Sequence, residues 1–144
     1  MKVQEIMTPR PISVGPDEPV TAAARLLSRC NLGAVPVCDA QGHIRGMVTD
    51  RDIALRCVAM GNSPSLKISE IMSRNIAAVE ASESVENAAR LMGERQVRRL
   101  PVTENGRLVG MLTLCDLARR EELRMECAQA LGVISAGVHR TSAY

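Results

Sequence analysis

Aromatic side chains are almost missing from this sequence. Its 144 residues contain no Phe and no Trp, and the single Tyr is Tyr144 at the very end. Branched and flexible aliphatic side chains must therefore fill the core. Proteins that bind single-stranded nucleic acid stack the bases on aromatic side chains, so this composition argues against that class.

An excess of charge of one sign is missing as well. Eighteen basic and sixteen acidic residues leave a net charge of +2, whereas nucleic-acid binding depends on the neutralisation of many phosphates. No apolar run approaches the eighteen or more residues of a membrane helix, and no apolar stretch of a signal peptide follows the first residues. We therefore expect neither a nucleic-acid partner nor a membrane partner.

The cysteines form no recognisable pattern. They are odd in number, widely spaced and free of a C-x-x-C pair, so the sequence indicates neither a disulfide framework nor a zinc site. We expect a cytoplasmic protein without a metal ion. The five are Cys30, Cys38, Cys57, Cys115 and Cys127.

Catalytic constellations are missing too. The two histidines, His43 and His139, begin neither a G-x-S-x-G nor an H-E-x-x-H motif, and no glycine-rich phosphate-binding loop is found. We therefore expect that the protein is not an enzyme and requires no cofactor.

What the sequence does contain is an internal repeat, which decides the fold before any other feature. The two copies align at an offset of about 65 residues and agree over about fifty residues each. The matching segments are Glu5–Thr8 with Glu70–Ser73, Val20–Leu27 with Val85–Met92, Val35–Val37 with Leu100–Val102, and Gly46–Ala54 with Gly110–Ala118.

Each copy predicts the order strand, helix, strand, strand, helix. Apolar residues at helical spacing start at Val20 and at Val85, and Asp17 and Ser82 are the expected N-caps. Two β-branched runs joined by a glycine turn follow and predict a hairpin. The expected strands are 34–38 and 44–49 in the first copy and 100–103 and 108–113 in the second, with final helices from Asp50 and Leu114.

One copy alone is too small to cover both faces of its sheet. We therefore expect an α+β fold in which two repeats pack sheet to sheet with pseudo-twofold symmetry. The expected division is repeat 1 at 1–60, a linker at 61–67, repeat 2 at 68–124 and a C-terminal tail at 125–144. The uncharged part of the tail, 128–138, could extend the last helix, cover a neighbour or be disordered.

The duplicated pattern resembles the CBS-domain family, in particular the stand-alone bacterial proteins that consist of one tandem pair, or Bateman module. The family markers are I-M-T/S, an apolar-x-P strand and G-h-h-T/S-x-x-D. Both copies carry them in order, as Ile6–Thr8, Val35–Val37 and Gly46–Asp52, and as Ile71–Ser73, Leu100–Val102 and Gly110–Asp116.

This resemblance implies a regulatory sensor that binds an adenosine nucleotide in clefts between the repeats. An Asp can accept both ribose hydroxyls, and a Thr three residues earlier can offer its hydroxyl and N–H. The resemblance assigns ribose to Asp52 and Asp116, with Thr49 and Thr113 beside them. Adenine would lie against Ile12 and Val35 in one cleft and Ala77 and Leu100 in the other.

The two clefts should differ. Arg98 and Arg99 are phosphate candidates in the second copy, whereas the first has Gly33 and Ala34 there; conversely, Arg51 stands where the second copy has Cys115. The arginines favour AMP or ATP as the ligand. The resemblance also implies a homodimer and an effector protein on another chain.

Other interpretations stay open. The two aspartates could serve only as helix caps, the aliphatic residues only as core, and Arg98 and Arg99 only as a solvated turn. The pair would then be a ligand-free homodimeric interaction module. A cysteine-based redox sensor is a third possibility, because Cys115 stands near a helix start, where a thiolate is favoured, although Cys is also a common buried residue.

Overall fold

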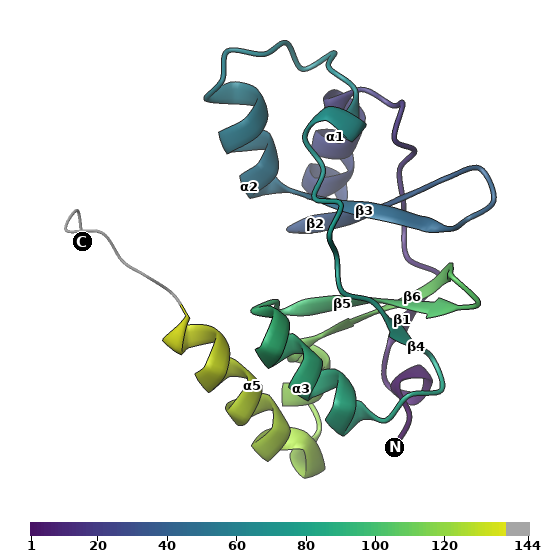
Figure 1. The fold of residues 1–144 in the computed structure, drawn as a ribbon, viewed down its shortest axis with the longest axis vertical. Coiled ribbons are helices and arrows are strands. Elements are labelled where there is room, and N and C mark those ends of the chain that lie inside the picture. Colours follow the sequence, from purple (N-terminus) through teal and green to yellow (C-terminus); the bar gives the residue numbers. More distant parts are fainter. Residues whose placement is uncertain (138–144) are drawn as a thin grey trace. The chain divides into compact units, whose positions relative to one another are not determined.

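The computed structural model describes residues 1–137 and divides them into two compact units (Figure 1). Unit 1 contains Met1–Arg10, Ala77–Asn105 and the described residues from Val109 on, and unit 2 contains Pro11–Ile76 and Gly106–Leu108. The first ten residues thus lie with the second sequence repeat. The opening of the second repeat lies with the first.

Unit 2 is built on a helix and a hairpin. Helix α1 (Val20–Cys30) precedes strands β2 (Ala34–Cys38) and β3 (Ile44–Thr49), which pair antiparallel. The strand bounds are those that the sequence predicts. Single bridges add one residue on each side of the hairpin, Val14 parallel to Val37 and Ser73 antiparallel to Met47.

In unit 1 the corresponding hairpin has a short strand on each side, where unit 2 has only single bridges among its described residues. The four-stranded sheet of unit 1 has the order β1-β6-β5-β4, formed by β1 (Thr8–Pro9), β6 (Arg107–Thr113), β5 (Arg99–Glu104) and β4 (Val79–Glu80). The pair β1–β6 is antiparallel and the pair β4–β5 is parallel. Helix α3 (Val85–Arg95) corresponds to α1. Short 3-10 turns at Val3–Glu5, Ile68–Glu70 and Glu121–Leu123 complete the connections.

The expected N-caps are wrong by two residues. The cap of α1 is Pro19 and the cap of α3 is Ser84, whose side chain accepts a hydrogen bond from the Asn87 N–H. Backbone carbonyls also satisfy these helix starts. The N–H of Val20 donates to Leu66, and the N–H of Val85 donates to Met1.

The final helix differs between the repeats. In the first, α2 (Asp50–Asp52) continues into a π-helical stretch, Ile53–Val58. In the second, α4 (Leu114–Ala118) ends after five residues. Both begin at the predicted residue. A π-helical stretch inside a helix is rare and often lies at a functional site.

The expected tail begins with an ordered helix. Helix α5 (Arg124–Ala136) runs beside α3 (Figure 1) and buries Ala130 and Ile134 in the core of unit 1. It therefore covers a neighbouring helix, which is one of the three alternatives for this segment. His139 lies outside the described residues.

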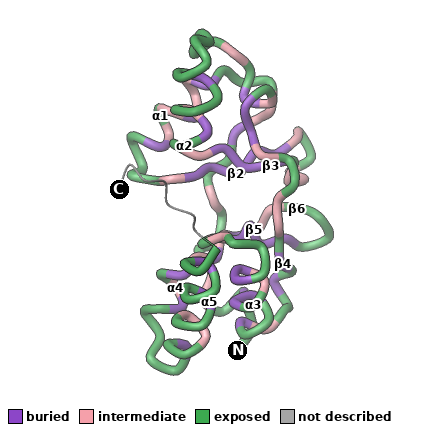
Figure 2. The backbone as a smooth tube through the Cα atoms, turned by 60° about the vertical axis from the view of Figure 1, so that its left-hand side comes forward, coloured by how far each residue is buried: buried purple, intermediate pink, exposed green. Residues whose placement is uncertain are grey.

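Each unit has its own aliphatic core, visible as the buried stretches of strand and helix in Figure 2. The largest fully buried side chains include Leu100, Leu112 and Met92 in unit 1, and Ile68, Ile71 and Val35 in unit 2. Ile, Leu, Val and Met side chains thus fill the cores of a sequence that has no Phe and no Trp, as expected.

Candidate functional site

The two Thr-x-x-Asp motifs form the same hydrogen-bonded box. In unit 2, the Thr49 Oγ1 accepts from the Asp52 N–H at 3.0 Å, and the Asp52 Oδ2 accepts from the Thr49 N–H at 2.9 Å. In unit 1, the Asp116 N–H donates to the Thr113 Oγ1 at 3.3 Å, and the Thr113 N–H donates to the Asp116 Oδ2 at 2.8 Å. Each Thr is therefore the N-cap of the final helix, and each Asp is the third helical residue that completes a capping box.

The capping leaves one carboxylate oxygen of each aspartate outside the box. The Asp52 Oδ1 lies 3.8 Å from the Arg56 Nε, and the Asp116 Oδ1 lies 3.4 Å from the Arg119 Nη1. Both carboxylates are nearly buried, with side-chain exposures of 11% and 9%. An ionised carboxylate with a spare oxygen and an adjacent cation can accept hydroxyl donors. The cap and a hydroxyl-binding role are thus compatible.

The segment before each apolar-x-P strand touches the start of the final helix. The Gly33 carbonyl accepts from the Asp50 N–H in unit 2, and the Arg98 carbonyl accepts from the Leu114 N–H in unit 1. Arg98 is exposed and Arg99 is half-buried, so both basic residues lie beside the Thr113 motif. In the first repeat this place holds Gly33 and Ala34, which carry no charge. The exposed Arg51 lies within the first motif itself.

The four aliphatic candidates differ in exposure. Val35 and Leu100 are fully buried in the two cores, whereas Ile12 is 45% exposed and Ala77 is half-buried. Only Ile12 and Ala77 therefore present surface to a ligand. Core packing accounts for the other two.

The structure divides the candidates between the units. Unit 2 holds Ile12, Val35, Thr49, Arg51 and Asp52, and unit 1 holds Ala77, Arg98, Arg99, Leu100, Thr113 and Asp116.

Sequence reasoning missed the two arginines that contact the aspartates. Arg56 follows Asp52 by four residues and Arg119 follows Asp116 by three, the spacings at which side chains on a helix are neighbours. This spacing in the sequence is the signal by which the two arginines could be predicted as partners of the aspartates.

The cysteines contribute little to these motifs. Cys115 is exposed, while Cys38 is buried and burial raises the pKa of its thiol. Within residues 1–137 no group of three or more His, Cys, Asp and Glu side chains could hold a metal ion. No helix in that range is both long and apolar enough to cross a bilayer.

Comparison with known proteins decides the family. The family model described as "CBS domain" matches twice, over residues 3–58 and 68–122, which together are most of the chain. The chain belongs to the CBS-domain family. The α+β fold with a tandem pair of CBS repeats, expected from the duplicated motifs, is therefore confirmed.

A bacterial relative of similar length accompanies this match. The chain is similar to the CBS domain-containing protein YhcV of Bacillus subtilis, with 39% identity over 92% of this chain and 94% of YhcV. It is also similar to the crystal structure of hypoxic response protein I, which holds two coordinated zinc ions, with a TM-score of 0.78 and 36% identity over 83% of this chain and 98% of the other.

Two further solved CBS proteins hold adenosine compounds. The CBS pair of MJ0100, in complex with 5'-methylthioadenosine and S-adenosyl-L-methionine, has a TM-score of 0.74 and 29% identity over 83% of this chain and 94% of the other. CBSX2 in complex with AMP has a TM-score of 0.73 and 30% identity over 87% and 98%. CBS pairs similar to this one thus bind adenosine ligands.

Proposed function

We propose that this protein is a non-catalytic regulatory module that binds an adenosine nucleotide at its two Thr-x-x-Asp motifs. AMP and ATP are the favoured ligands. The duplicated box carries the proposal. In each unit an anchored, nearly buried carboxylate keeps one oxygen outside the box, beside a hydroxyl-bearing Thr. In both units the carboxylate oxygen outside the box can accept a ribose hydroxyl, although the Thr113 hydroxyl itself donates to the Asp116 Oδ2 at 2.8 Å.

The adenosine complexes of the similar CBS pairs support the ligand class. The basic residues support a phosphorylated ligand, because Arg98 and Arg99 lie beside the Thr113 motif and Arg51 lies within the Thr49 motif. Guanidinium groups recognise phosphate by paired hydrogen bonds. Since the two arrangements differ, the two motifs should differ in affinity or in the number of phosphates they prefer.

The adenine contacts are proposed for the two accessible aliphatic residues. Ile12 and Ala77 offer accessible surface, one in each unit, whereas Val35 and Leu100 belong to the two cores. Loss of either accessible side chain should weaken adenine binding without disturbing the ribose contacts.

We further propose that the protein acts as a cytoplasmic homodimer that reports to a separate effector protein. Exposed apolar side chains support an interface. They are Leu55 and Val58 on the last helix of the first repeat, Met60 after it, and Met125, Leu131 and Val133 on α5. The unpaired cysteines suit a reducing compartment.

Thermal unfolding of nucleotide-stripped protein tests the ligand. We expect AMP, ADP or ATP at about one hundred times the dissociation constant to stabilise the fold by about 2.7 kcal/mol. S-adenosylmethionine and the guanosine nucleotides complete the panel.

Asp52→Asn and Asp116→Asn should each remove part of this response, because the amide keeps the shape of the carboxylate but loses its charge. Asp50→Asn is the matched control: Asp50 is exposed in the same helical turn, outside the box, and its variant should respond like the parent. If no adenosine compound shifts the midpoint at millimolar concentration, the aspartates are caps only and the ligand-free interaction module replaces this proposal.

A further inference from the structure

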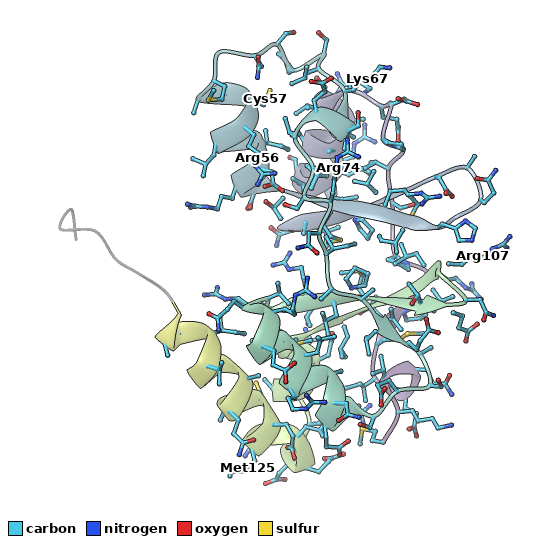
Figure 3. The ribbon with its side chains drawn as sticks, in the orientation of Figure 1. Arg56, Cys57, Lys67, Arg74, Arg107 and Met125 are labelled. Carbon is cyan, nitrogen blue, oxygen red and sulfur yellow. The ribbon has the colours of Figure 1, made fainter. Side chains whose placement is uncertain are left out.

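Arg56 connects the carboxylate of the first motif with the opening of the second repeat. Its Nε lies 3.8 Å from the Asp52 Oδ1, and its Nη1 donates to the Ile71 carbonyl at 3.0 Å and to the Met72 carbonyl at 3.5 Å. One planar guanidinium thus contacts a side chain and two backbone carbonyls from a distant part of the chain (Figure 3 labels Arg56). All these groups belong to unit 2.

The segment that Arg56 contacts, Ile71–Ser73, is held along one edge of the hairpin. Ile71 is 1% exposed, and Ser73 exchanges two backbone hydrogen bonds with Met47, at 2.8 and 3.0 Å. Three residues after Ser73, at Ile76, the chain leaves unit 2 and continues into unit 1. The segment therefore lies a few residues before this covalent crossing.

The second repeat lacks this arrangement. Arg119 contacts the Asp116 carboxylate, but within the described residues its guanidinium makes no hydrogen bond to a backbone carbonyl, and its side chain is 77% exposed. The Arg120 side chain, at the position that matches Arg56, makes no hydrogen bond with residues 1–137 either. Among the described residues, an arginine thus connects the first motif, and not the second, to a crossing segment.

We propose that Arg56 is a positioning residue that couples the state of Asp52 to the segment Ile71–Ser73, so that ligand binding at the first motif alters the chain that leads into unit 1. The proposal rests on the proposed function for the identity of the ligand. A ribose hydroxyl that donates to the Asp52 Oδ1 occupies the oxygen beside the Arg56 Nε. Because the guanidinium is rigid, a displacement of its Nε also displaces its Nη1. The hydrogen bonds from Nη1 to the two carbonyls then change as well.

Hydrogen exchange of the peptide that covers 71–76 tests the coupling without any ligand. We expect exchange to be faster in Arg56→Met, by about two- to fivefold, the factor that corresponds to a partly exposed ion pair. Asp52→Asn should produce a similar change in the parent and no additional change in the double variant. Arg56→Lys should still exchange faster than the parent, because one ammonium nitrogen cannot take the places of both the Nε and the Nη1. Arg119→Met is the matched control and should leave the peptide unchanged.

The non-additivity separates coupling from simple packing. If the effects of Arg56→Met and Asp52→Asn add, Arg56 serves only as a local anchor and the proposal is overturned. Saturating AMP should reproduce the change of Asp52→Asn in the parent and have no effect on this peptide in Arg56→Met. If AMP binds and the effects add, the proposed function stands and the coupling fails. If no adenosine compound of the panel binds and the effects do not add, the proposed function fails and the connection between Asp52 and the segment stands.

Discussion

A backbone carbonyl passes directly over the glycine that opens each G-h-h-T-x-x-D motif. A β-carbon placed on Gly46 would lie 2.6 Å from the Ser73 carbonyl oxygen, and one placed on Gly110 would collide with the Met7 side chain. Real β-carbons do not come so close to backbone atoms. Gly46 is therefore required by the close approach of the Ser73 backbone, whereas a β-carbon at Gly110 would need the flexible Met7 side chain to move.

We expect Gly46→Ala to lower the free energy of unfolding by about 1–3 kcal/mol, the usual cost of overpacking. Gly132→Ala is the control, because nothing lies within 4 Å of a β-carbon on that glycine in α5; it should be neutral or stabilising, since Ala favours a helix over Gly. Urea unfolding of both variants measures the difference. Equal stabilities would show that the strand edge shifts freely.

Asp39 anchors the turn between β2 and β3. Partial burial acts to raise the pKa of its carboxyl, but hydrogen bonds from the His43 and Gln41 N–H groups and from the Arg45 guanidinium outweigh it, so the pKa is lowered. A lowered pKa in the folded state gives stability that is present above the ordinary value of 3.8 and is lost as the pH falls through the folded value.

We therefore expect Asp39→Asn to be less stable than the parent at pH 7, with the gap closing as the pH is taken below 3.8. Urea unfolding at pH 7 and at acid pH gives the comparison. The variant Asp17→Asn, whose side chain is 83% exposed, should differ little from the parent at either pH. A gap that stays constant with pH would assign the effect of Asp39→Asn to geometry and not to charge.

The sequence indicates which residues form the two motifs, but it does not indicate which distant residues contact them. Thr49, Asp52, Thr113 and Asp116 follow from the repeated pattern, because the same types recur at the same spacing. Contacts between distant segments have no such sequence signal. Arg56 donates to the Ile71 carbonyl because the first residues of the second repeat pack against the first repeat. The burial of Val35 and Leu100 reflects the same limit, since strand residues of one type can face a core or a ligand.

At the scale of elements, α5 is the part of unit 1 that the repeat does not explain. Its side chains are apolar on several faces, it packs beside α3, and its Ala130 and Ile134, both 4% exposed, belong to the core of unit 1. We expect Ile134→Ala to cost about 2–5 kcal/mol of stability, as for other buried Ile residues. Leu131→Ala, on the same helix but 44% exposed, should stay within about 0.5 kcal/mol of the parent. Urea unfolding that ranks the two variants equally would contradict the packing.

The elements were predicted best where a local signal defines both ends. Strands β2 and β3 are bounded by glycines and by the Thr49 cap, and their bounds match the prediction. The predicted N-caps lie two residues early because the sequence signal for a cap is a polar side chain. The actual N–H acceptors include the carbonyls of Leu66 and Met1, which any residue type can supply. The π-helical stretch has no local signal either.

At the scale of the whole molecule, the apolar side chains left on the surface predict self-association. Val58 and Met60 are 70% and 71% exposed, which is unusual for side chains that gain free energy when buried. We expect light scattering after size exclusion to give twice the 15.6 kDa of one chain. The double variant Val58→Glu/Met60→Glu should shift towards the mass of one chain, and Ser65→Glu, in the exposed linker, should not. A parent that elutes as a single chain at high micromolar concentration would contradict the homodimer.

The exchange of chain openings between the units has a consequence for synthesis. Unit 2 receives nearly all of its residues once the chain has reached Ile76, whereas unit 1 needs Met1–Arg10 together with residues beyond Val109. On a ribosome, where chains emerge from the N-terminus, these ten residues precede all of their partners in unit 1: Val3 and Gln4 bond to Glu83 and Ala81, and Thr8–Pro9 join β6. A fusion partner or truncation at the N-terminus would therefore disturb the maturation of the second repeat and spare the first.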